Sequence, residues 1–377
     1  MRSLFSETAA SAQHFLHERC RNFIRVRIAQ ISPLYEAVPP LLYGGTERVV
    51  AYLTDALVDA GHEVTLFASA EARTRATLVP MRDQAIRLDP APLKSDLAAH
   101  LTLLHDVRRR AHEFDMLHFH VDLLHYPFFE DCAGKTVTTL HGRLDLKDLP
   151  QAYRRWPQFP LVSISDRQRG PLGNVNWVGT IHHGLPSGLL RYSPTPTGGY
   201  LAFLGRISPE KRVDRAIAIA RRAGIPLRIA AKIDAVDRAY FESDIAPLLD
   251  GDGVEFIGEI SDEQKGRFLG DALALLFPVD WPEPFGLVMV EAMACGTPVV
   301  AWNCGSVPEV IEPGVTGCIV ESVQQAVDAL PAVLALDRRT IRERFEHRFS
   351  AKVMAASYAN LYQRLLQRDD ALQRLIA

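Results

Sequence analysis

Residues 25–69 read RVRIAQISPLYEAVPPLLYGGTERVVAYLTDALVDAGHEVTLFAS and predict one strand–helix–strand unit. Arg25–Ser32 alternates in polarity and stops at a proline, which is typical of a buried strand followed by a turn. Apolar residues then recur at helical spacing from Val49 onward, and Gly61 ends this helix before a second strand at Glu63–Ser69. A unit of this kind forces two parallel strands joined by a right-handed crossover.

The alternation of strands and helices continues and then starts again. Further strands of the first half are expected at 116–120, 136–140 and 161–164. The second half is expected to have strands at 200–204, 227–231, 254–257, 272–277 and 298–302, and helices at 213–223 and 286–294. The predicted fold is therefore α/β, with two doubly wound Rossmann-like domains. In such sheets ligands bind at the carboxyl ends of the strands, so we expect a site in a cleft between the domains.

The domain limits follow from composition. Residues 191–199 read RYSPTPTGG, and their Pro, Gly, Ser and Thr content indicates a linker. We expect a first domain at 25–190, a second at 200–350, and a helix at 351–377 that crosses back to the first domain. Residues 1–24 lack the apolar core of a signal peptide, so we expect a loosely attached extension, with a membrane-surface helix as the alternative.

Composition excludes several classes of protein. Lysine and arginine number 42 against 45 acids, so no basic field favours a nucleic-acid partner. The five cysteines stand far apart without a CxxC pair, which argues against a disulfide framework and favours a reducing, cytoplasmic location. The longest uncharged stretch, 170–190, contains five Gly and two Pro, so we expect no membrane span, although peripheral membrane contact stays open.

The most informative segment is WPEPFGLVMVEAMAC at 281–295. Glu283 lies in a loop restricted by two prolines, and Glu291 follows about two helical turns later, so both can face one cleft. A carboxylate is an acceptor for pairs of sugar or ribose hydroxyls. The intervening helix start would offer backbone amides to an anion, those of Phe285, Gly286 and Leu287. The alternative is that Glu291 is an ordinary solvated helix residue.

Two further motifs fit a phosphate-bearing ligand. In FLGRISPEK, Arg206 ends a strand and Lys211 opens the next helix, so the two cations can neutralise a diphosphate. They could also be ordinary surface bases, and Arg212 is expected to be a solvated neighbour. Gly44 and Gly45 lack the GxGxxG spacing of a dinucleotide site, but they let the backbone approach a ligand closely unless they only form a tight turn.

Histidines are concentrated in the first half of the chain. Nine of the 13 lie between His100 and His183, and His141 directly follows a predicted strand. We expect His141 to contact the reacting ligand. No carboxylate or cysteine completes a metal-ligand spacing with these histidines. The pair Asp250 and Asp252 falls in a Gly-rich turn before a strand, so no metal site is predicted.

Together these motifs resemble the retaining GT-B glycosyltransferases of family four. The segment EPFGLVMVE matches the Glu-x7-Glu signature of that family, and Gly44 and Gly45 match its N-terminal glycine loop. Arg206 and Lys211 match its diphosphate clamp, and CGTPVVA and GSVPEVI match its C-terminal pattern. The resemblance covers about residues 25–365. Two positions depart from it: Lys211-Arg212 replaces the usual Lys-Gly, and His183-Gly184 replaces the usual Asn-Gly.

The resemblance implies roles for the matched residues. Glu291 would bind the ribose hydroxyls, Glu283 hydroxyls of the transferred sugar, and Arg206 with Lys211 the leaving diphosphate. Ile260 lies where the family's backbone reads the base. His141 lies where a family histidine contacts the sugar near the reacting carbon.

The implied activity is metal-free, retaining transfer of a hexose from a nucleotide sugar to an acceptor hydroxyl. UDP-glucose or GDP-mannose is the expected donor, and a glycan, a lipid or a small molecule is the expected acceptor. No cofactor is expected, and the chain is expected to be a monomer or a homodimer. The alternatives are a GT-B nucleotide-sugar epimerase and a non-catalytic nucleotide-sugar sensor.

Overall fold

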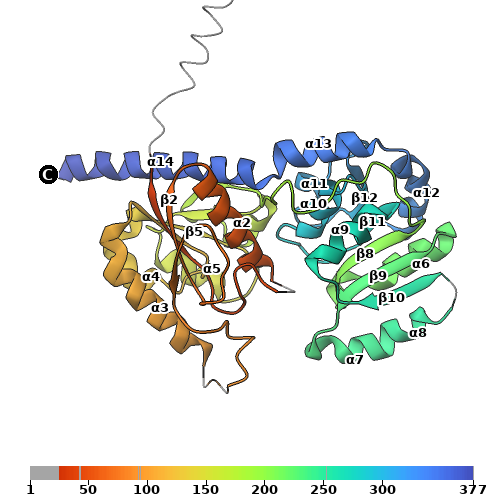
Figure 1. The fold of residues 1–377 in the computed structure, drawn as a ribbon, viewed down its shortest axis with the longest axis horizontal. Helices are drawn as coiled ribbons and strands as arrows, with labels where there is room; N and C mark the ends of the chain where they lie inside the picture. The colour runs from red at the N-terminus through yellow and green to blue at the C-terminus, as the bar shows by residue number, and fades with distance from the viewer. Residues whose placement is uncertain (1–24, 42–43, 92, 94, 252, 377) are drawn as a thin grey trace, which may run out of the picture.

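The computed structural model describes residues 25–376, apart from 42, 43, 92, 94 and 252. It has two α/β domains, each built on a parallel sheet, and a long helix that runs over the first domain (Figure 1). The predicted extension at 1–24, Tyr43 of the glycine loop and Asp252 of the Asp-x-Asp pair lie outside the described residues. The predicted α/β class with two doubly wound domains is confirmed.

In the first domain, later strands are added on both sides of the first strand. Its seven strands lie in the order β3-β2-β1-β4-β5-β6-β7, all parallel. They are β1 (Arg27–Ile31), β2 (Glu63–Ala68), β3 (Thr77–Pro80), β4 (Met116–Phe119), β5 (Thr136–Thr139), β6 (Leu161–Ser163) and β7 (Trp177–Thr180). The helices are α2 (Gly45–Asp59), α3 (Asp96–Arg110), α4 (Tyr126–Phe129) and α5 (Leu149–Arg155), with short 3₁₀ turns η1 (Ala111–Glu113), η2 (Glu130–Lys135) and η3 (Arg167–Leu172).

The second domain repeats this plan with six parallel strands in the order β10-β9-β8-β11-β12-β13. They are β8 (Leu201–Arg206), β9 (Leu227–Lys232), β10 (Val254–Gly258), β11 (Ala274–Phe277), β12 (Val299–Trp302) and β13 (Gly317–Val320). The helices are α6 (Val213–Ala223), α7 (Arg238–Tyr240), α8 (Ala246–Leu249), α9 (Asp262–Gly270), α10 (Leu287–Ala294), α11 (Val307–Val310), α12 (Val323–Leu334) and α13 (Arg338–Arg348). Shorter turns are η4 (Pro209–Lys211), η5 (Ala235–Asp237) and the π-helical η6 (Phe241–Ile245).

Most of the predicted strands have residues buried on both faces, and the exception is the half-exposed edge strand β10. Each strand expected from an apolar run is present, with ends that differ by a few residues. The edge strands β3, β7 and β13 were not predicted: β3 and β7 contain no fully buried residue, and β13 is buried only at its two ends. A half-exposed edge tolerates polar residues and so loses the apolar run that identifies a central strand.

The chain crosses from the first domain to the second after Leu185 and returns after Ser350, and these two crossings lie side by side. Leu185 forms a parallel bridge with Ser350, and the Ala351 N–H donates to the Leu185 carbonyl at 2.7 Å. A Cβ on Gly184 would lie 2.5 Å from the Ser350 oxygen, so only glycine fits there. The segment 191–199, predicted as the linker, lies along the second domain, where Ser193 and Gly198 N–H groups donate to backbone carbonyls.

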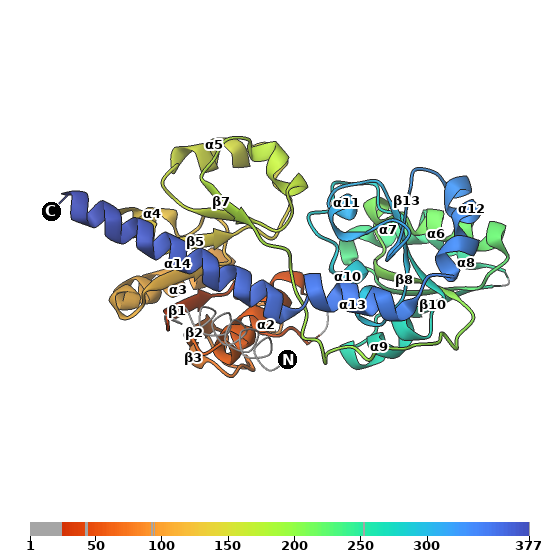
Figure 2. The same cartoon turned by 90° about the horizontal axis from the view of Figure 1, so that it is seen from above.

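The last helix, α14 (Ala351–Ile376), starts at this crossing and returns over the first domain. Figure 2 shows it continuing from α13 and passing across the first domain. Tyr358 and Tyr362 of α14 are buried there. Among the residues that the structure describes, none of the helices combines the length and the apolar character needed to cross a membrane.

Candidate active site

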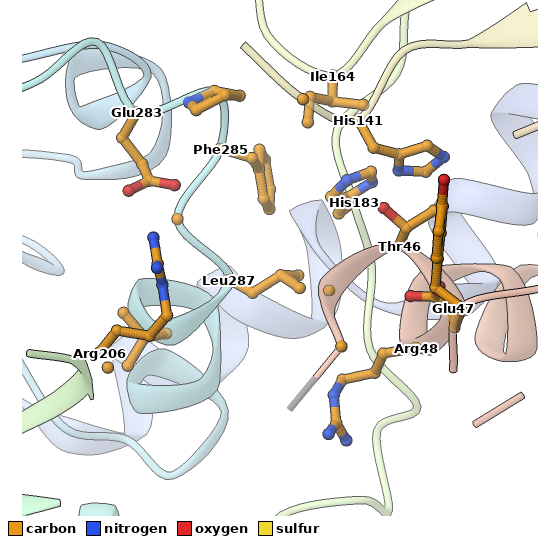
Figure 3. A pocket seen from close by; sticks show the side chains of 18 of the residues that line it. Thr46, Glu47, Arg48, His141, Ile164, His183, Arg206, Glu283, Phe285 and Leu287 are labelled. Carbon is orange, nitrogen blue, oxygen red and sulfur yellow. The ribbon is translucent and has the colours of Figure 1, made fainter. Parts of the chain in front are cut away.

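A cleft of about 790 Å³ lies between the domains. It is lined by loops that follow the strands of both sheets, as expected for doubly wound folds. Figure 3 shows Arg206, Glu283 and Leu287 on the wall of the second domain, opposite His141 and residues 46–48 of the first domain. All residues predicted to bind the ligand line this cleft: Gly44, Gly45, His141, Arg206, Lys211, Ile260, Glu283, Phe285, Gly286, Leu287 and Glu291.

Glu283 is held by two donors. Lys211 Nζ makes a short ion pair with Glu283 Oε2, and Trp281 Nε1 donates to the same oxygen at 2.9 Å. Lys211 Nζ also lies 5.0 Å from the centre of the Trp281 ring, a cation–π distance. The carboxylate and the ammonium are therefore fixed beside each other on the wall of the cleft, with Oε2 as the oxygen that both donors contact.

The GSVPEVI motif is the support of the Glu283 loop. Gly305 has a φ of +54°, and a Cβ there would lie 2.4 Å from the Glu283 backbone nitrogen. The Ser306 N–H donates to the Glu283 carbonyl at 3.0 Å, and Ser306 Oγ donates to the Phe285 carbonyl at 2.8 Å. This motif therefore positions the acidic loop and does not line the cleft itself.

Arg206 is surrounded by carboxylates. Its guanidinium lies 3.2 Å from Asp234, 3.3 Å from Glu210 and 3.8 Å from Asp237. These acids orient the guanidinium at the end of β8. An incoming phosphate would share the cation with them.

Arg212 was expected to be a solvated neighbour, and that prediction is wrong. It has a left-handed backbone, with φ at +53°, at the position where the resembling family has glycine. Its guanidinium is half-buried and bonds Asp214 at 2.8 Å and Asp280 at 2.7 Å. A non-glycine residue costs roughly 1–2 kcal/mol in this region, and the two ion pairs hold Arg212 in this conformation at the start of α6.

Glu291 is the end of a row of charges that joins the domains. Its Oε1 accepts from Lys265 Nζ at 2.7 Å, and Lys265 lies 3.1 Å from Asp262. Asp262 makes a short ion pair with Arg48, which comes from α2 of the first domain. Burial favours neutral Lys265, but Glu291 and Asp262 together outweigh it and raise the pKa of this ammonium. The cleft is thus bridged by charges directly after the glycine loop.

The glycines of the cleft differ in why glycine is required. A Cβ on Gly44 would lie 2.8 Å from Pro40, whereas nothing lies within 4 Å of one on Gly45, the first residue of α2. Gly286 has a φ of +75°, and a Cβ there would meet Met289 at 2.8 Å. Gly286 caps α10, and no side chain caps that helix start. The first amides of α10 therefore remain available to a ligand.

His141 lies between two other imidazoles, those of His120 and His183. His120 Nδ1 is 2.8 Å from His141 Nε2, and the His183 ring stacks on His141 with centroids 5.2 Å apart. Burial lowers the pKa of His141 to about 3, so the imidazole is neutral at physiological pH. The departure at His183 thus supplies the stacking ring, while Gly184, which the usual Asn-Gly also has, is the glycine required at the domain crossing. Among the described residues no cluster of histidine, cysteine or acid could hold a metal.

Two known families match most of the chain. Residues 43–167 match the family described as Glycosyltransferase Family 4, and residues 194–348 match the one described as glycosyl transferases group 1. The chain belongs to the group 1 glycosyltransferases. The two matches place the glycine loop and His141 in one family region, and the clamp and both acids in the other.

Relatives of this group 1 glycosyltransferase align over different lengths. The D-inositol 3-phosphate glycosyltransferase of Mycolicibacterium smegmatis is 32% identical over 177 residues, 42% of this chain and 39% of the relative. The phosphatidyl-myo-inositol mannosyltransferase of the same species is 26% identical over 389 residues, 90% of this chain and 94% of the relative. For the first curated relatives the chain aligns with less than half of their length.

A solved structure supports the fold over both domains. Anabaena HepE, in complex with UDP and glucose, superposes with a TM-score of 0.68 at 18% identity. The match covers 89% of this chain and 99% of that chain. The group 1 glycosyltransferase therefore has the two-domain GT-B fold, and the fold expected from the resemblance is confirmed.

Several site residues of this group 1 glycosyltransferase gave no separate signal in the sequence. Arg48 and Lys265 complete the charge row, and Glu309 of α11 joins the domains. Glu309 accepts from the N–H groups of Asp166 and Arg167 at 2.8 and 2.9 Å. Burial opposes its ionisation, but hydrogen bonds from His182 and these amides lower its pKa. The only available clues were the position of Arg48 after the glycines and that of Glu309 within GSVPEVI.

Proposed function

We propose that this protein is a retaining glycosyltransferase that moves a hexose from a nucleoside-diphosphate sugar to an acceptor hydroxyl. The observation that carries the proposal is the convergence of two carboxylates, two cations and a neutral histidine on one interdomain cleft. The carboxylates fit hydroxyl donors, and the cations fit a diphosphate.

The donor lies along the wall of the second domain in this proposal. Ribose hydroxyls donate to Glu291, and the base lies near Ile260. The diphosphate reaches Arg206, Lys211 and the uncapped amides of α10. A helix start and two cations supply positive charge to a phosphate group without a metal ion.

The transferred sugar lies between Glu283 and His141. Glu283 Oε1 remains open to hydroxyls, since Lys211 and Trp281 both bond Oε2. Across the cleft, His141 offers its Nδ1. The two walls therefore hold opposite sides of the sugar ring.

The reaction breaks the bond between the anomeric carbon and the diphosphate oxygen, and the electron pair stays on the diphosphate. The acceptor oxygen forms its new bond on the same face of the sugar, and its proton passes to the leaving phosphate. Fixed cations stabilise the negative charge that develops on the leaving group, which lowers the barrier most in the transition state.

The donor is proposed to be UDP-glucose, with GDP-mannose as the second choice. The HepE structure with UDP and glucose supports the first choice, and the mannosyltransferase relative supports the second. The acceptor is a hydroxyl of a small molecule, a lipid or a glycan. The described cysteines, Cys132, Cys295, Cys304 and Cys318, are free, which agrees with a cytoplasmic location.

Incubation with single nucleotide sugars tests the activity. We expect nucleotide release to increase when a matching acceptor is added, and to fall strongly in Lys211→Ala. Conversion of the sugar without an acceptor would show an epimerase instead. Donor binding by calorimetry without any conversion, across a panel of acceptors, would show a sensor.

A further inference from the structure

A chain of buried polar side chains connects the last helix to the cleft. It passes from Tyr362 of α14 to His118 and Gln30, and from there to His120 and His141. These five side chains come from α14, from the central strands β1 and β4, and from the loops that follow β4 and β5. The first four are less than 4% exposed, so their polar atoms must find partners inside the protein.

Gln30 sets the direction in which hydrogen bonds are donated along this row of side chains. Its Oε1 accepts from His120 Nε2 at 2.8 Å, while its Nε2 lies 3.4 Å from both His118 Nδ1 and the Tyr362 hydroxyl. Gln30 and His118 are register partners of adjacent strands, which keeps the amide beside the imidazole. The amide thus presents its oxygen to His120 and its nitrogen to His118.

The orientation of the Gln30 amide determines the roles of His118 and Tyr362. The Tyr362 hydroxyl lies 2.7 Å from His118 Nδ1, and His118 Nε2 lies 2.7 Å from Thr139 Oγ1. Tyr358, also from α14, lies 2.7 Å from the same Thr139 oxygen. Because the Gln30 amide nitrogen can only donate, His118 Nδ1 is an acceptor, the Tyr362 hydroxyl donates to it, and His118 Nε2 carries the proton that is donated to Thr139 Oγ1.

The same direction of hydrogen-bond donation continues from His120 to His141. Because His120 donates from Nε2 to Gln30, its Nδ1 is bare and accepts from His141 Nε2 at 2.8 Å. A neutral imidazole carries one proton, so His141 Nδ1 is also bare. Among the described residues this Nδ1 has no hydrogen-bond partner, although it is buried in a residue that lines the cleft.

We propose that this relay fixes His141 as the Nε2–H tautomer, so that its bare Nδ1 accepts a hydrogen bond from a hydroxyl of the bound sugar. Gln30, His120 and Tyr362 are positioning residues, and α14 is part of the apparatus that orients the reactive histidine. The assignment of a sugar hydroxyl rests on the proposed function, whereas the tautomer does not. Burial lowers the pKa of His118, His120 and His141, in agreement with a neutral relay.

Nitrogen-15 NMR of histidine-labelled full-length protein tests the relay without any substrate. The His141 signal is assigned by its loss in His141→Gln. We expect a protonated Nε2 and a bare Nδ1 for His141 from pH 6 to pH 8. A protonated Nδ1, or both nitrogens protonated in this range, would overturn the relay.

Variants connect the tautomer to turnover. His120→Leu removes the acceptor of His141 Nε2, so both tautomers should appear and kcat should fall about 10- to 100-fold, as when a partner that orients a histidine is lost. The KM for the donor should stay close to that of the wild type. His120→Asn, with an amide oxygen near the position of Nδ1, should recover most of the activity. Equal kcat in His120→Leu and wild type would contradict the proposal.

Tyr362→Phe tests the far end of the relay if His120→Leu does not fold. It should give a mixture of His141 tautomers, whereas an unchanged single tautomer would overturn the role of α14. Tyr153→Phe is the matched control, because the buried Tyr153 hydroxyl has no partner among the described residues. If no nucleotide sugar is turned over but the His141 tautomer is as expected, the proposed function fails and the relay stands.

Discussion

Lys265 Nζ on α9 lies 2.7 Å from Glu291 Oε1 on α10, and both side chains are nearly buried. The carboxylate proposed to bind ribose therefore already has a cationic partner. Since Lys265 also bonds Asp262, it can keep one acid while a ribose hydroxyl takes its place on the other. Donor binding and the interdomain charge row thus depend on the same lysine.

Glu291→Gln should weaken donor binding. It keeps the size of the side chain but replaces a charged acceptor, so we expect a loss of about 1.5–3 kcal/mol, the range for hydrogen bonds to charged groups. Calorimetry with UDP-glucose and with GDP-mannose measures this loss. Glu263→Gln, on the exposed side of α9, is the control and should bind normally. Unchanged affinity in a folded Glu291→Gln would refute the ribose contact.

Lys211→Ala and Arg206→Ala should each lower kcat more than they raise the donor KM. Their charge is most valuable when the diphosphate departs, and by analogy with the loss of one oxyanion donor we expect about a 10²- to 10³-fold decrease. Steady-state kinetics separates the two parameters. Arg222→Ala, on the exposed end of α6, should behave as the wild type. Normal kcat in both clamp variants would exclude the clamp.

The reaction should not require a divalent metal. The cleft offers two cations and a helix start for the leaving group, and these take the place of a metal ion in the proposed chemistry. We expect the initial rate in excess EDTA to equal the untreated rate. A full loss of activity that magnesium or manganese restores would refute metal-free catalysis.

Arg48 should control the opening of the cleft. Arg48→Met keeps the length of the side chain but breaks the pair with Asp262, so the donor-free protein should have a larger radius of gyration by small-angle scattering. Saturating donor should reduce this radius in both proteins, because the proposed ligand contacts both walls. Arg75→Met is the control, since Arg75 pairs with Asp55 and Asp59 inside one domain. No change in radius with donor would indicate a permanently closed cleft.

Stability should decrease in mild acid. Burial lowers the pKa of six described histidines below 6.5, so below that pH the unfolded chain binds protons that the native state does not: His62, His118, His120, His125, His141 and His183. Their contribution is complete above pH 6.5 and is lost as the pH falls toward the native values. As the pH falls, each of these groups lowers the free energy of unfolding by up to about 1.4 kcal/mol per pH unit.

Thermal unfolding at pH 7.5 and pH 5.5 measures this loss. The midpoint should be clearly lower at pH 5.5, and the exposed variant His105→Gln should show the same decrease. A midpoint that does not fall would contradict the neutral burial of these imidazoles.

The sequence was informative where neighbours in the chain act together. The strand–helix–strand unit, the Glu-x7-Glu segment and the clamp are local patterns, and their residues reach the cleft because parallel strands end at one edge of a sheet. The pairing of Lys211 with Glu283 was not predictable. It joins two loops of different strands, and neither the loop path nor the side-chain direction is encoded in spacing.

Contacts between distant segments carry the rest of the site. Arg48 meets Asp262 from the other domain, and Gln30 meets Tyr362 near the end of the chain. In the sequence Gln30 is one polar residue in a strand, and Tyr362 is one aromatic residue in an amphipathic helix. Their roles depend on where α14 is packed, which the local pattern does not specify.

The path of α14 also determines the order in which the molecule can be completed during synthesis. The first domain needs Tyr358 and Tyr362 inside it, yet the ribosome makes the whole second domain before residues 351–376. At about 5–20 residues per second this delay is on the order of ten to thirty seconds. During that time Gln30 and His118 have no tyrosine hydroxyl beside them. The domain that is translated first is therefore finished last, when α14 leaves the ribosome and is inserted.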